Sequence, residues 1–287
     1  MHRIRHIIND LRRSICPLCY SPKSMCLGYI RYNESIQFSS EAVKLEKRPE
    51  LWKCEDCQSA FVQNVLPEDT SRQLYSQGDS TNRWSAVVFE EDKPHEIVAE
   101  LSRLLTNGKQ HLDVGCGAGN LLDFSKARGC VTTGLDYSSA TRDYIERKGH
   151  AWFPCFKTLG AQDFDVITAF DLIEHLYDVR AFLQECCGRL RPGGRLVILT
   201  GNIDCLSARI ARQHWWYAAY PEHIVFPSIR FFGTYRLERL IPTYAAKAYQ
   251  STLIGKLRGV VAGMVRRGCY SGQPALGPDH MLLTLRA

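Results

Sequence analysis

The chain has 287 residues, of which 45% are hydrophobic and 23% charged, and its formal net charge is +6. These values are typical of globular proteins and suit one large domain or two modest ones. The charge is too small to indicate a nucleic-acid partner, and we expect none. No apolar run approaches the ~20 residues that cross a bilayer, so no transmembrane segment is expected.

The first 13 residues are basic but lack the long apolar stretch of a secretory signal, and we expect a lead-in helix there. We therefore expect a cytoplasmic protein whose 12 cysteines do not form a disulfide framework. Four of them form two CxxC pairs, Cys16–Cys19 and Cys54–Cys57, separated by 34 residues. Four thiolates on two tight turns suit tetrahedral zinc in a closed structural site. Redox chemistry at one CxxC is the alternative, which the second matched pair disfavours.

Hydrophobic patterning divides the chain into three parts. The stretches 27–32 and 60–66 have strand composition, so residues 1–66 are predicted to form a small zinc-ribbon-like module, and the polar residues 67–93 a connector. Over 94–287, helices are expected at 96–105, 120–128, 138–148 and 179–190, with a basic helix at 253–267. Strands are expected at 111–114, 131–136, 164–170, 195–200, 245–251 and 280–287, with a turn at 191–194. This alternation predicts an α/β domain with a mostly parallel sheet covered on both faces.

The segment HLDVGCGAGNLLDF places a glycine-rich loop between a strand and a helix. The strand ends near Asp113, and the loop contains Gly115, Gly117 and Gly119, which permit positive φ angles and close approach of a ligand. A dinucleotide fingerprint would have its third glycine at the position of Asn120. A carboxylate before the loop repels a pyrophosphate and suits a ligand with an ammonium group. The loop therefore favours S-adenosylmethionine over NAD(P).

A second acid, Asp136, closes the next strand about 20 residues after the loop. A carboxylate there can accept hydrogen bonds from both ribose hydroxyls of a nucleoside. Capping of the following helix is the alternative role, but Ser138 and Ser139 are already available as caps.

Four segments, LDVGCGAGN, GLDYS, FDVITAFDLIEHLYD and LRPGGRL, occur in an order and spacing that resemble class I S-adenosylmethionine-dependent methyltransferases over residues 95–205. The resemblance implies a Rossmann-like seven-stranded sheet with its last strand antiparallel. It also implies that Asp113, Gly115, Cys116 and Gly117 line the methionine end of the cofactor and that Asp136 holds the ribose. The full set of expected cofactor-binding residues is Asp113, Gly115, Cys116, Gly117, Gly119, Asp136, Tyr137, Phe170 and Asp171.

Three residues after the predicted strand at 164–170 have open roles. Asp171 is expected to contact the methionine amine or the acceptor, or else to form a helix cap or a salt bridge. Glu174 and His175 resemble a Glu-His pair that binds a metal in some families, but two residues alone do not define a metal site.

The acceptor side is expected in HWWYAAYPEHIVFPS, with Tyr220, Glu222 and His223 as catalytic residues. Histidine is the side chain most easily poised as a base near neutral pH. YPEHIVFPS resembles the YHEHxxYFS segment of sugar C-methyltransferases, except at Pro221 and at Phe226-Pro227. The alternative is that His223 only forms hydrogen bonds in a lid or core. Methyl transfer does not always need a base, because the methyl carbon is already activated.

The cysteine-containing head, polar connector and cofactor domain together resemble bacterial methyltransferases of sugar, surface-glycan and natural-product pathways. They imply methyl transfer to oxygen or carbon of a small-molecule or glycan-linked acceptor. Two other functions stay open at this point: a zinc-containing adaptor with an inactive methyltransferase fold, and a dinucleotide-dependent oxidoreductase. Asp136 and the intact glycine loop disfavour the first, and Asp113 with Asn120 the second. The sequence does not indicate an oligomeric state.

Overall fold

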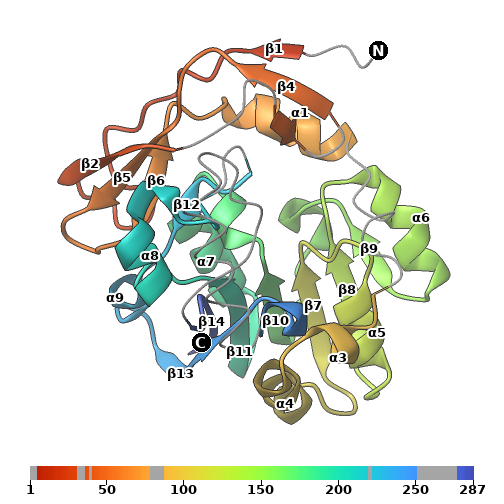
Figure 1. Cartoon of the computed structure of the whole chain (residues 1–287). Helices are drawn as coiled ribbons and strands as arrows, with labels where there is room; N and C mark the ends of the chain where they lie inside the picture. Colours follow the sequence, from red (N-terminus) through yellow and green to blue (C-terminus); the bar gives the residue numbers. More distant parts are fainter. Residues whose placement is uncertain (1–4, 31–35, 39–40, 78–86, 219–221, 251–276) are drawn as a thin grey trace.

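The structure is a computed structural model that describes residues 5–30, 36–38, 41–77, 87–218, 222–250 and 277–287 (Figure 1). In this described part of the chain, no helix has the length and apolar character to cross a membrane.

A seven-stranded sheet forms the centre of the larger part of the molecule. Its strand order is β13-β14-β11-β10-β7-β8-β9. The strands are β7 (Gln110–Val114), β8 (Val131–Leu135), β9 (Ala151–Phe153), β10 (Phe164–Phe170), β11 (Leu190–Gly201), β13 (Leu237–Thr243) and β14 (His280–Arg286). Only β14 runs antiparallel to its neighbours, and the other pairings in this sheet are parallel. The predicted seven-stranded, mostly parallel sheet is confirmed.

Helices cover both faces of this sheet because successive strand residues point to opposite sides. On β10, Ile167 packs in a cluster with helix α7 (Val179–Gly188), whereas Val166 packs in another with helices α4 (His95–Leu104) and α5 (Asn120–Lys126). Helix α6 (Ser139–Arg147) contacts β9 at the end of the sheet. The shorter helical segments are α3 (Phe89–Asp92), η1 (Phe156–Leu159), η2 (Ile173–His175), α8 (Leu206–Ala211), η3 (Arg212–His214), α9 (Ile229–Phe232) and η4 (Lys247–Tyr249).

The N-terminal residues form two small sheets above the large one in Figure 1. Strands β1 (Arg5–Ile7), β3 (Ile36–Phe38) and β4 (Glu41–Leu45) make one, in the order β1-β4-β3. Strands β2 (Ser24–Tyr29), β5 (Glu50–Cys54) and β6 (Ala60–Gln63) make the other, whose fourth strand is β12 (Val225–Phe226). The second sheet therefore includes a strand from the C-terminal half of the chain. The buried residues of this region and of the α7 face of the large sheet belong to one continuous hydrophobic cluster.

Helix α1 (Glu68–Gln77) occupies much of the segment that was expected to be a polar connector. Its Tyr75 hydroxyl lies 3.0 Å from Nδ1 of His175, which follows β10, and its Arg72 guanidinium lies 5.5 Å from the ring centre of Tyr137, which follows β8. Helix α1 thus crosses the carboxyl edge of the parallel strands. The residues before Pro94 are part of the surroundings of this edge.

The expected lead-in helix at 1–13 is wrong, because β1 pairs in parallel with β4 and Leu11 forms a bridge with Val65. The buried Asn9 explains the difference. Its amide donates to the carbonyls of Lys47 and Asn64, at 2.7 and 2.8 Å, and its oxygen accepts from the N–H of Lys47. Side-chain bonds of this kind compete with a helix.

The expected strand at 245–251 is also wrong, because the edge strand β13 ends at Thr243 and η4 lies within the predicted range. Pro242 pairs with Met281 on that edge, where a missing N–H is tolerated. The predicted turn at 191–194 falls within β11, but it interrupts the pairing with β10 between Leu190 and Arg195. The basic helix expected at 253–267 lies outside the described residues.

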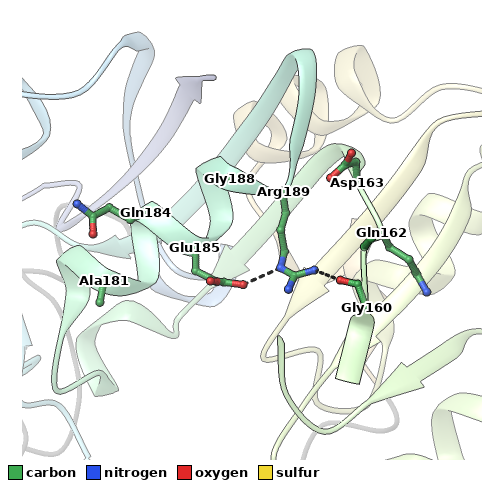
Figure 2. Close-up of a pocket in the computed structure, with 9 residues that line it drawn as sticks. Gly160, Gln162, Asp163, Ala181, Gln184, Glu185, Gly188 and Arg189 are labelled. Carbon is green, nitrogen blue, oxygen red and sulfur yellow. Dashed lines mark hydrogen bonds and ion pairs between the residues drawn. The ribbon is translucent and has the colours of Figure 1, made fainter. Parts of the chain in front are cut away.

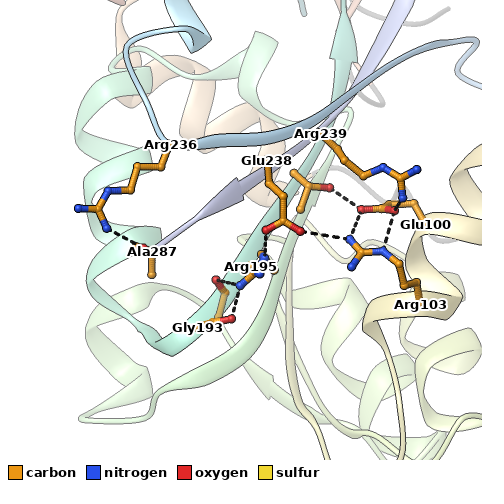
Figure 3. A network of polar contacts seen from close by, with 10 residues as sticks. Glu100, Arg103, Gly193, Arg195, Arg236, Glu238, Arg239 and Ala287 are labelled. Carbon is orange, nitrogen blue, oxygen red and sulfur yellow. Dashed lines mark hydrogen bonds and ion pairs between the residues drawn. The ribbon is translucent and has the colours of Figure 1, made fainter.

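A polar network fixes the β13–β14 end of the sheet to α4 (Figure 3). The Glu100 side chain is 1% exposed, and it accepts hydrogen bonds from Arg103 of its own helix, Arg239 of β13 and Thr284 of β14. Glu238 continues the network with ion pairs to Arg103 and Arg195.

Candidate active site

The glycine loop, residues 115–119, has the backbone conformation that its composition predicts. Gly115, Gly117 and Gly119 have φ angles of 76°, 48° and 77°. A Cβ on Gly119 would lie 2.5 Å from Cδ1 of Ile145, so this glycine is needed for close packing of the loop on α6. A Cβ on Gly117 would have no heavy atom of the described chain within 4 Å. The main chain at Gly117 therefore faces open space that a ligand can occupy.

Asp136 fastens the glycine loop to the neighbouring strand. One carboxylate oxygen accepts the N–H of Gly117 and the other accepts the N–H of Ser138, each at 2.9 Å. Asp136 thus contributes to the start of α6 as well, which was its alternative role. Burial raises the pKa of Asp136, and these two N–H groups act in the opposite direction. Each carboxylate oxygen has a further lone pair, so ribose binding by Asp136 stays a prediction.

Asp113 is buried at the end of β7 and receives a hydrogen bond from β10, the strand beside it in the sheet. The Thr168 hydroxyl of β10 donates to Asp113 at 2.6 Å, and Nε2 of His111 lies 2.9 Å from the same hydroxyl. Because the hydroxyl proton is used on Asp113, Nε2 of His111 must be the donor to Thr168. Burial lowers the pKa of His111 to about 3 and raises that of Asp113 to about 7.

Asp171 follows β10 in a left-handed conformation, with φ of 48°. One carboxylate oxygen lies 3.7 Å from Nζ of Lys93. The other is buried and has no hydrogen-bond partner among the residues that the structure describes. The salt-bridge role expected as an alternative is therefore present, and one acceptor remains available for a donor such as an ammonium group.

The other expected cofactor residues differ in their surroundings. Cys116 is buried, and its sulfur occupies the space next to Gly134, where a Cβ would lie 2.7 Å from it. Tyr137 is 49% exposed and lies against α1. The half-buried Phe170 ring packs 6.2 Å from that of Phe89. All nine expected residues lie at the carboxyl edge of β7, β8 and β10, where open α/β sheets bind ligands.

Two histidines meet beside this edge. Nδ1 of His223 lies 2.7 Å from the carbonyl oxygen of Tyr217, and Nδ1 of His175 lies 2.7 Å from that of Glu222. A carbonyl only accepts, so both Nδ1 atoms carry protons, and the neutral form of such a ring has its lone pair on Nε2. The ring centres are 4.9 Å apart. Burial and the neighbouring His175 lower the pKa of His223 to about 4, so the ring is neutral at neutral pH.

A buried acid, Glu174, is linked to His223 through Tyr217. Glu174 accepts hydrogen bonds from Thr200, at 2.9 Å, and from the Tyr217 hydroxyl. The Tyr217 ring centre lies 4.2 Å from that of His223. Metal-binding atoms of Glu174, His175 and His223 lie within 4.8 Å of one another, but both oxygens of Glu174 already accept bonds from the protein. We call Glu174, His175, Tyr217 and His223 the acceptor-side cluster.

Sequence reasoning found only part of this cluster. It named His223 and noted the Glu174–His175 pair, but it did not assign a role to Tyr217. Glu222 contributes a backbone carbonyl to His175, and a catalytic role for its side chain stays a prediction. Tyr220 lies outside the described residues.

The four expected zinc ligands come together in the N-terminal sheets. The sulfur atoms of Cys16, Cys19, Cys54 and Cys57 lie within 4.8 Å of one another. Those of Cys16 and Cys57 are 3.7 Å apart, and those of Cys19 and Cys54 are 3.5 Å apart. Zinc with Zn–S bonds of about 2.3 Å separates tetrahedral sulfurs by about 3.8 Å, so the donor set fits zinc.

The two CxxC turns have the same local geometry. Their first cysteines donate N–H bonds of 2.8 Å to the carbonyls of Ser21 and Ser59. The residues after their second cysteines, Tyr20 and Gln58, have φ angles of 63° and 62°. The hydrogen bond with Cys16 lowers the pKa of Cys57 to about 5, which favours the thiolate form that binds metals. Cys26, which is not part of either CxxC pair, is exposed on β2.

Comparison with known proteins identifies the larger part of the chain. A model of the family described as "Methyltransferase domain" matches residues 89–235, half of the chain. The chain belongs to this methyltransferase family. Its fold and motifs are those of class I S-adenosylmethionine-dependent methyltransferases, as the sequence predicts.

Relatives of this methyltransferase include enzymes of quinone biosynthesis. The ubiquinone biosynthesis O-methyltransferase of Coxiella burnetii (strain Dugway 5J108-111) is 34% identical over 111 residues, which are 35% of this chain and 47% of the relative. That of Bradyrhizobium sp. (strain ORS 278) is 35% identical over 114 residues, 37% of this chain and 45% of the relative. The chain thus spans about half the length of the curated relatives it matches.

Among solved structures, the N-methyltransferase NodS from Bradyrhizobium japonicum WM9, in complex with S-adenosyl-L-homocysteine, aligns with the methyltransferase at a TM-score of 0.47 and 17% identity. The alignment covers 76% of this chain and 96% of that chain.

A polar pocket of the methyltransferase lies at the opposite edge of the sheet, before β10 and at the C-terminal end of α7 (Figure 2). Arg189 crosses it, with an ion pair to Glu185 and bonds to the carbonyls of Gly160 and Phe156. Each of the three guanidinium nitrogens of Arg189 already donates a bond to the protein, and we assign no chemistry to this pocket.

Proposed function

We propose that the chain transfers the methyl group of S-adenosylmethionine to a hydroxyl group of a small-molecule acceptor. The proposal rests on the carboxyl edge of β7, β8 and β10, where an open main chain at Gly117 is bonded to the half-buried Asp136 and follows the buried Asp113. Asp113, Asp136 and Asp171 would hold the cofactor, with Asp113 and Asp171 toward its ammonium group and Asp136 toward its ribose. When bound, S-adenosylmethionine supplies an activated methyl carbon.

The acceptor-side cluster supplies the proton chemistry in this proposal. A hydroxyl acceptor loses its proton as the new bond to carbon forms, and Nε2 of His223 is a neutral base for that proton. Tyr217 packs against the His223 ring and donates its hydroxyl proton to Glu174, which would fix the orientation of His223. The ring of His175 lies next to that of His223. A C-methylation needs the same proton removal from carbon. The names of the curated relatives favour an oxygen acceptor, and the YPEHIVFPS segment favours a sugar acceptor.

We also propose a structural zinc ion on the four cysteines, within a module of residues 1–66 joined by 67–93 to the methyltransferase domain of 94–287. A reducing cytoplasm is the compartment that suits such a site and the remaining thiols. Elemental analysis should find one zinc per chain. A metal-free, folded protein with disulfides between these cysteines would contradict the zinc site.

A screen with the purified chain tests the main proposal. Labelled methyl donor is supplied with simple phenols in one set and nucleotide sugars in another. Label in a phenol supports an oxygen acceptor of the quinone type, and label in a sugar supports the glycan-pathway alternative. Absence of S-adenosylhomocysteine binding by calorimetry would overturn the proposal and make the adaptor function the better account.

A further inference from the structure

The strand that completes the N-terminal sheet begins two residues after His223. Val225 and Phe226 of β12 pair with Phe61 and Ala60 of β6. The carbonyl of Ile224 accepts the N–H of Val62 at 2.9 Å, which extends this ladder by one bond. The N–H of Ile224 donates in turn to the carbonyl of Glu174, at 2.7 Å. The main chain next to His223 is therefore held between the N-terminal sheet and the acceptor-side cluster.

Ser228 connects the same segment to the cysteine site. Its hydroxyl donates to the carbonyl of Cys57, and its N–H donates to the hydroxyl of Ser59 at 3.0 Å. The Ser228 oxygen also accepts the N–H of Phe231 at 3.0 Å, which caps α9. Ser59 and Ser228 are fully buried. Five residues after His223, the chain is thus bonded to the backbone of an expected zinc ligand.

We expect the order of the segment after His223 to depend on the cysteine site, because few bonds hold this segment. The β6–β12 ladder has only two residue pairs, so the bonds of Ser228 to Cys57 and Ser59 add substantially to the fixing of this segment on the N-terminal sheet. Zinc bound by thiolates contributes directly to the folding of the turns that carry them. Order at Cys57 and Ser59 therefore supports order at Ser228 and, through β12, at His223.

We infer that the four-cysteine site is a positioning device for His223, and that Ser228 is the positioning residue that links them. The inference rests on the proposed function for the role of His223, but the link itself is a property of the fold. A second contact of the cysteine site, the Tyr20 hydroxyl with Asp178 at the start of α7, does not lead to His223.

The test compares the zinc-loaded full chain with its Ser228→Ala variant by hydrogen–deuterium exchange. We expect the amides of 222–231 to exchange roughly tenfold faster in the variant, with zinc content unchanged. The pKa of His223, followed by NMR, should rise from about 4 toward its ordinary value as the half-buried ring becomes more exposed to solvent. Ser228→Thr retains the hydroxyl and should restore both values.

Tyr20→Phe is the matched control, because it removes a side-chain bond of the cysteine site that leads to α7. It should leave exchange at 222–231 unchanged. Unchanged exchange in Ser228→Ala with zinc bound would overturn the inference. If that variant does not fold, zinc is removed from the wild-type chain by a chelator. If removal of zinc increases exchange more at 222–231 than at β7 and α4, the inference is supported. An equal increase in all three segments overturns it.

Calorimetry with S-adenosylhomocysteine separates this inference from the proposed function. If S-adenosylhomocysteine does not bind the wild-type chain, the proposed methyltransferase function is wrong. The exchange data would still show whether the cysteine site orders the segment 222–231. Ser228→Ala should bind S-adenosylhomocysteine as the wild type does, because the residues expected to hold it lie at the ends of β7, β8 and β10, outside the segment 222–231.

Discussion

The ionisation of Asp113 depends on a hydroxyl that the neighbouring strand supplies. Burial raises the pKa of this carboxyl to about 7, and the hydrogen bond from Thr168 acts in the opposite direction. His111 donates to Thr168 from behind and so fixes the direction in which the hydroxyl proton points. A cationic ligand needs Asp113 in its charged form. Thr168 is therefore expected to set the pH range in which the cofactor binds.

Replacing Thr168 with valine should weaken S-adenosylhomocysteine binding at pH 7 by roughly tenfold, since a hydrogen bond to a charged group contributes about 1.5–3 kcal/mol. The loss of the donor raises the pKa of Asp113 further, so affinity should recover as the pH is raised above about 8. Calorimetry over a pH series measures this. The matched control is Thr200→Val on β11, which removes a hydroxyl that donates to Glu174. It should leave the affinity for S-adenosylhomocysteine unchanged. A pH-independent loss in Thr168→Val would contradict the role of the hydroxyl.

Replacing His223 with alanine should lower kcat by about 10²–10⁴-fold, the usual contribution of a positioned base, with little change in S-adenosylhomocysteine affinity. With saturating S-adenosylmethionine, so that the ionisation of Asp113 does not limit binding, the wild-type kcat should fall only as the pH approaches 4, because burial keeps His223 neutral through the ordinary histidine range. Steady-state rates across pH test both points. The exposed His214 provides the control, and His214→Ala should be as active as the wild type. Full turnover in His223→Ala would remove the histidine from the mechanism.

At the scale of elements, the Glu100 network joins α4 to the two strands that close the sheet (Figure 3). Burial raises the pKa of Glu100, but the bonds from Arg103 and Thr284 and the nearby guanidinium groups lower it more, so the net pKa lies below its ordinary value. A depressed carboxyl pKa stabilises the fold above the pKa of the unfolded state, and that stabilisation is lost as the pH falls through the folded pKa.

Glu100→Gln should therefore lower the free energy of unfolding by about 2 kcal/mol at neutral pH, less than a fully buried pair because both arginines are half-exposed. The difference from the wild type should shrink as the pH falls through the lowered pKa of Glu100, where its carboxyl becomes protonated as well. Denaturant titrations at several pH values measure this. Glu146→Gln, in an exposed pair with Arg142, should change stability by less than about 0.5 kcal/mol. An equal effect in the two variants would contradict the buried network.

Elements were predictable where the pattern was local and repeated. The strands at whose ends Asp113, Asp136 and Phe170 lie follow from apolar runs and glycines, and the structure confirms them. The segments that were wrong or missed depend on distant partners. Asn9 bonds to carbonyls of residues 47 and 64, and Val225 pairs with Phe61. Neither a two-residue strand nor a buried asparagine has a periodicity that sequence reasoning can detect.

The candidate site divides in the same way. The glycine loop and the acids beside it lie within contiguous motifs, so their grouping at one edge follows from a parallel sheet. The acceptor-side cluster joins Glu174 and His175 to Tyr217 and His223 through backbone carbonyls and a hydroxyl. A backbone carbonyl has no sequence signal, so the tautomers of the two histidines required the structure.

At the scale of the whole molecule, cofactor binding should raise the stability of the fold. S-adenosylhomocysteine at 100 times its Kd should add about 2.7 kcal/mol to the free energy of unfolding, which corresponds to a rise in Tm of about 5–10 °C. NADH at the same concentration should have no effect, because Asp113 and Asp171 disfavour a pyrophosphate. Thermal unfolding scans with each ligand measure this. A larger rise with NADH would reverse the assignment of the glycine loop.

The shared sheet β12-β6-β5-β2 makes the boundary of the matched family, at residue 89, different from a boundary of independent folding. A fragment starting there would expose the backbone edge of Val225 and Phe226 and the apolar surface around them, which invites aggregation. Deletion of the N-terminal part, or its replacement by an unrelated sequence, would expose the same surface. The two parts are therefore expected to fold and unfold together, even though only one of them contains the residues proposed to bind the methyl donor.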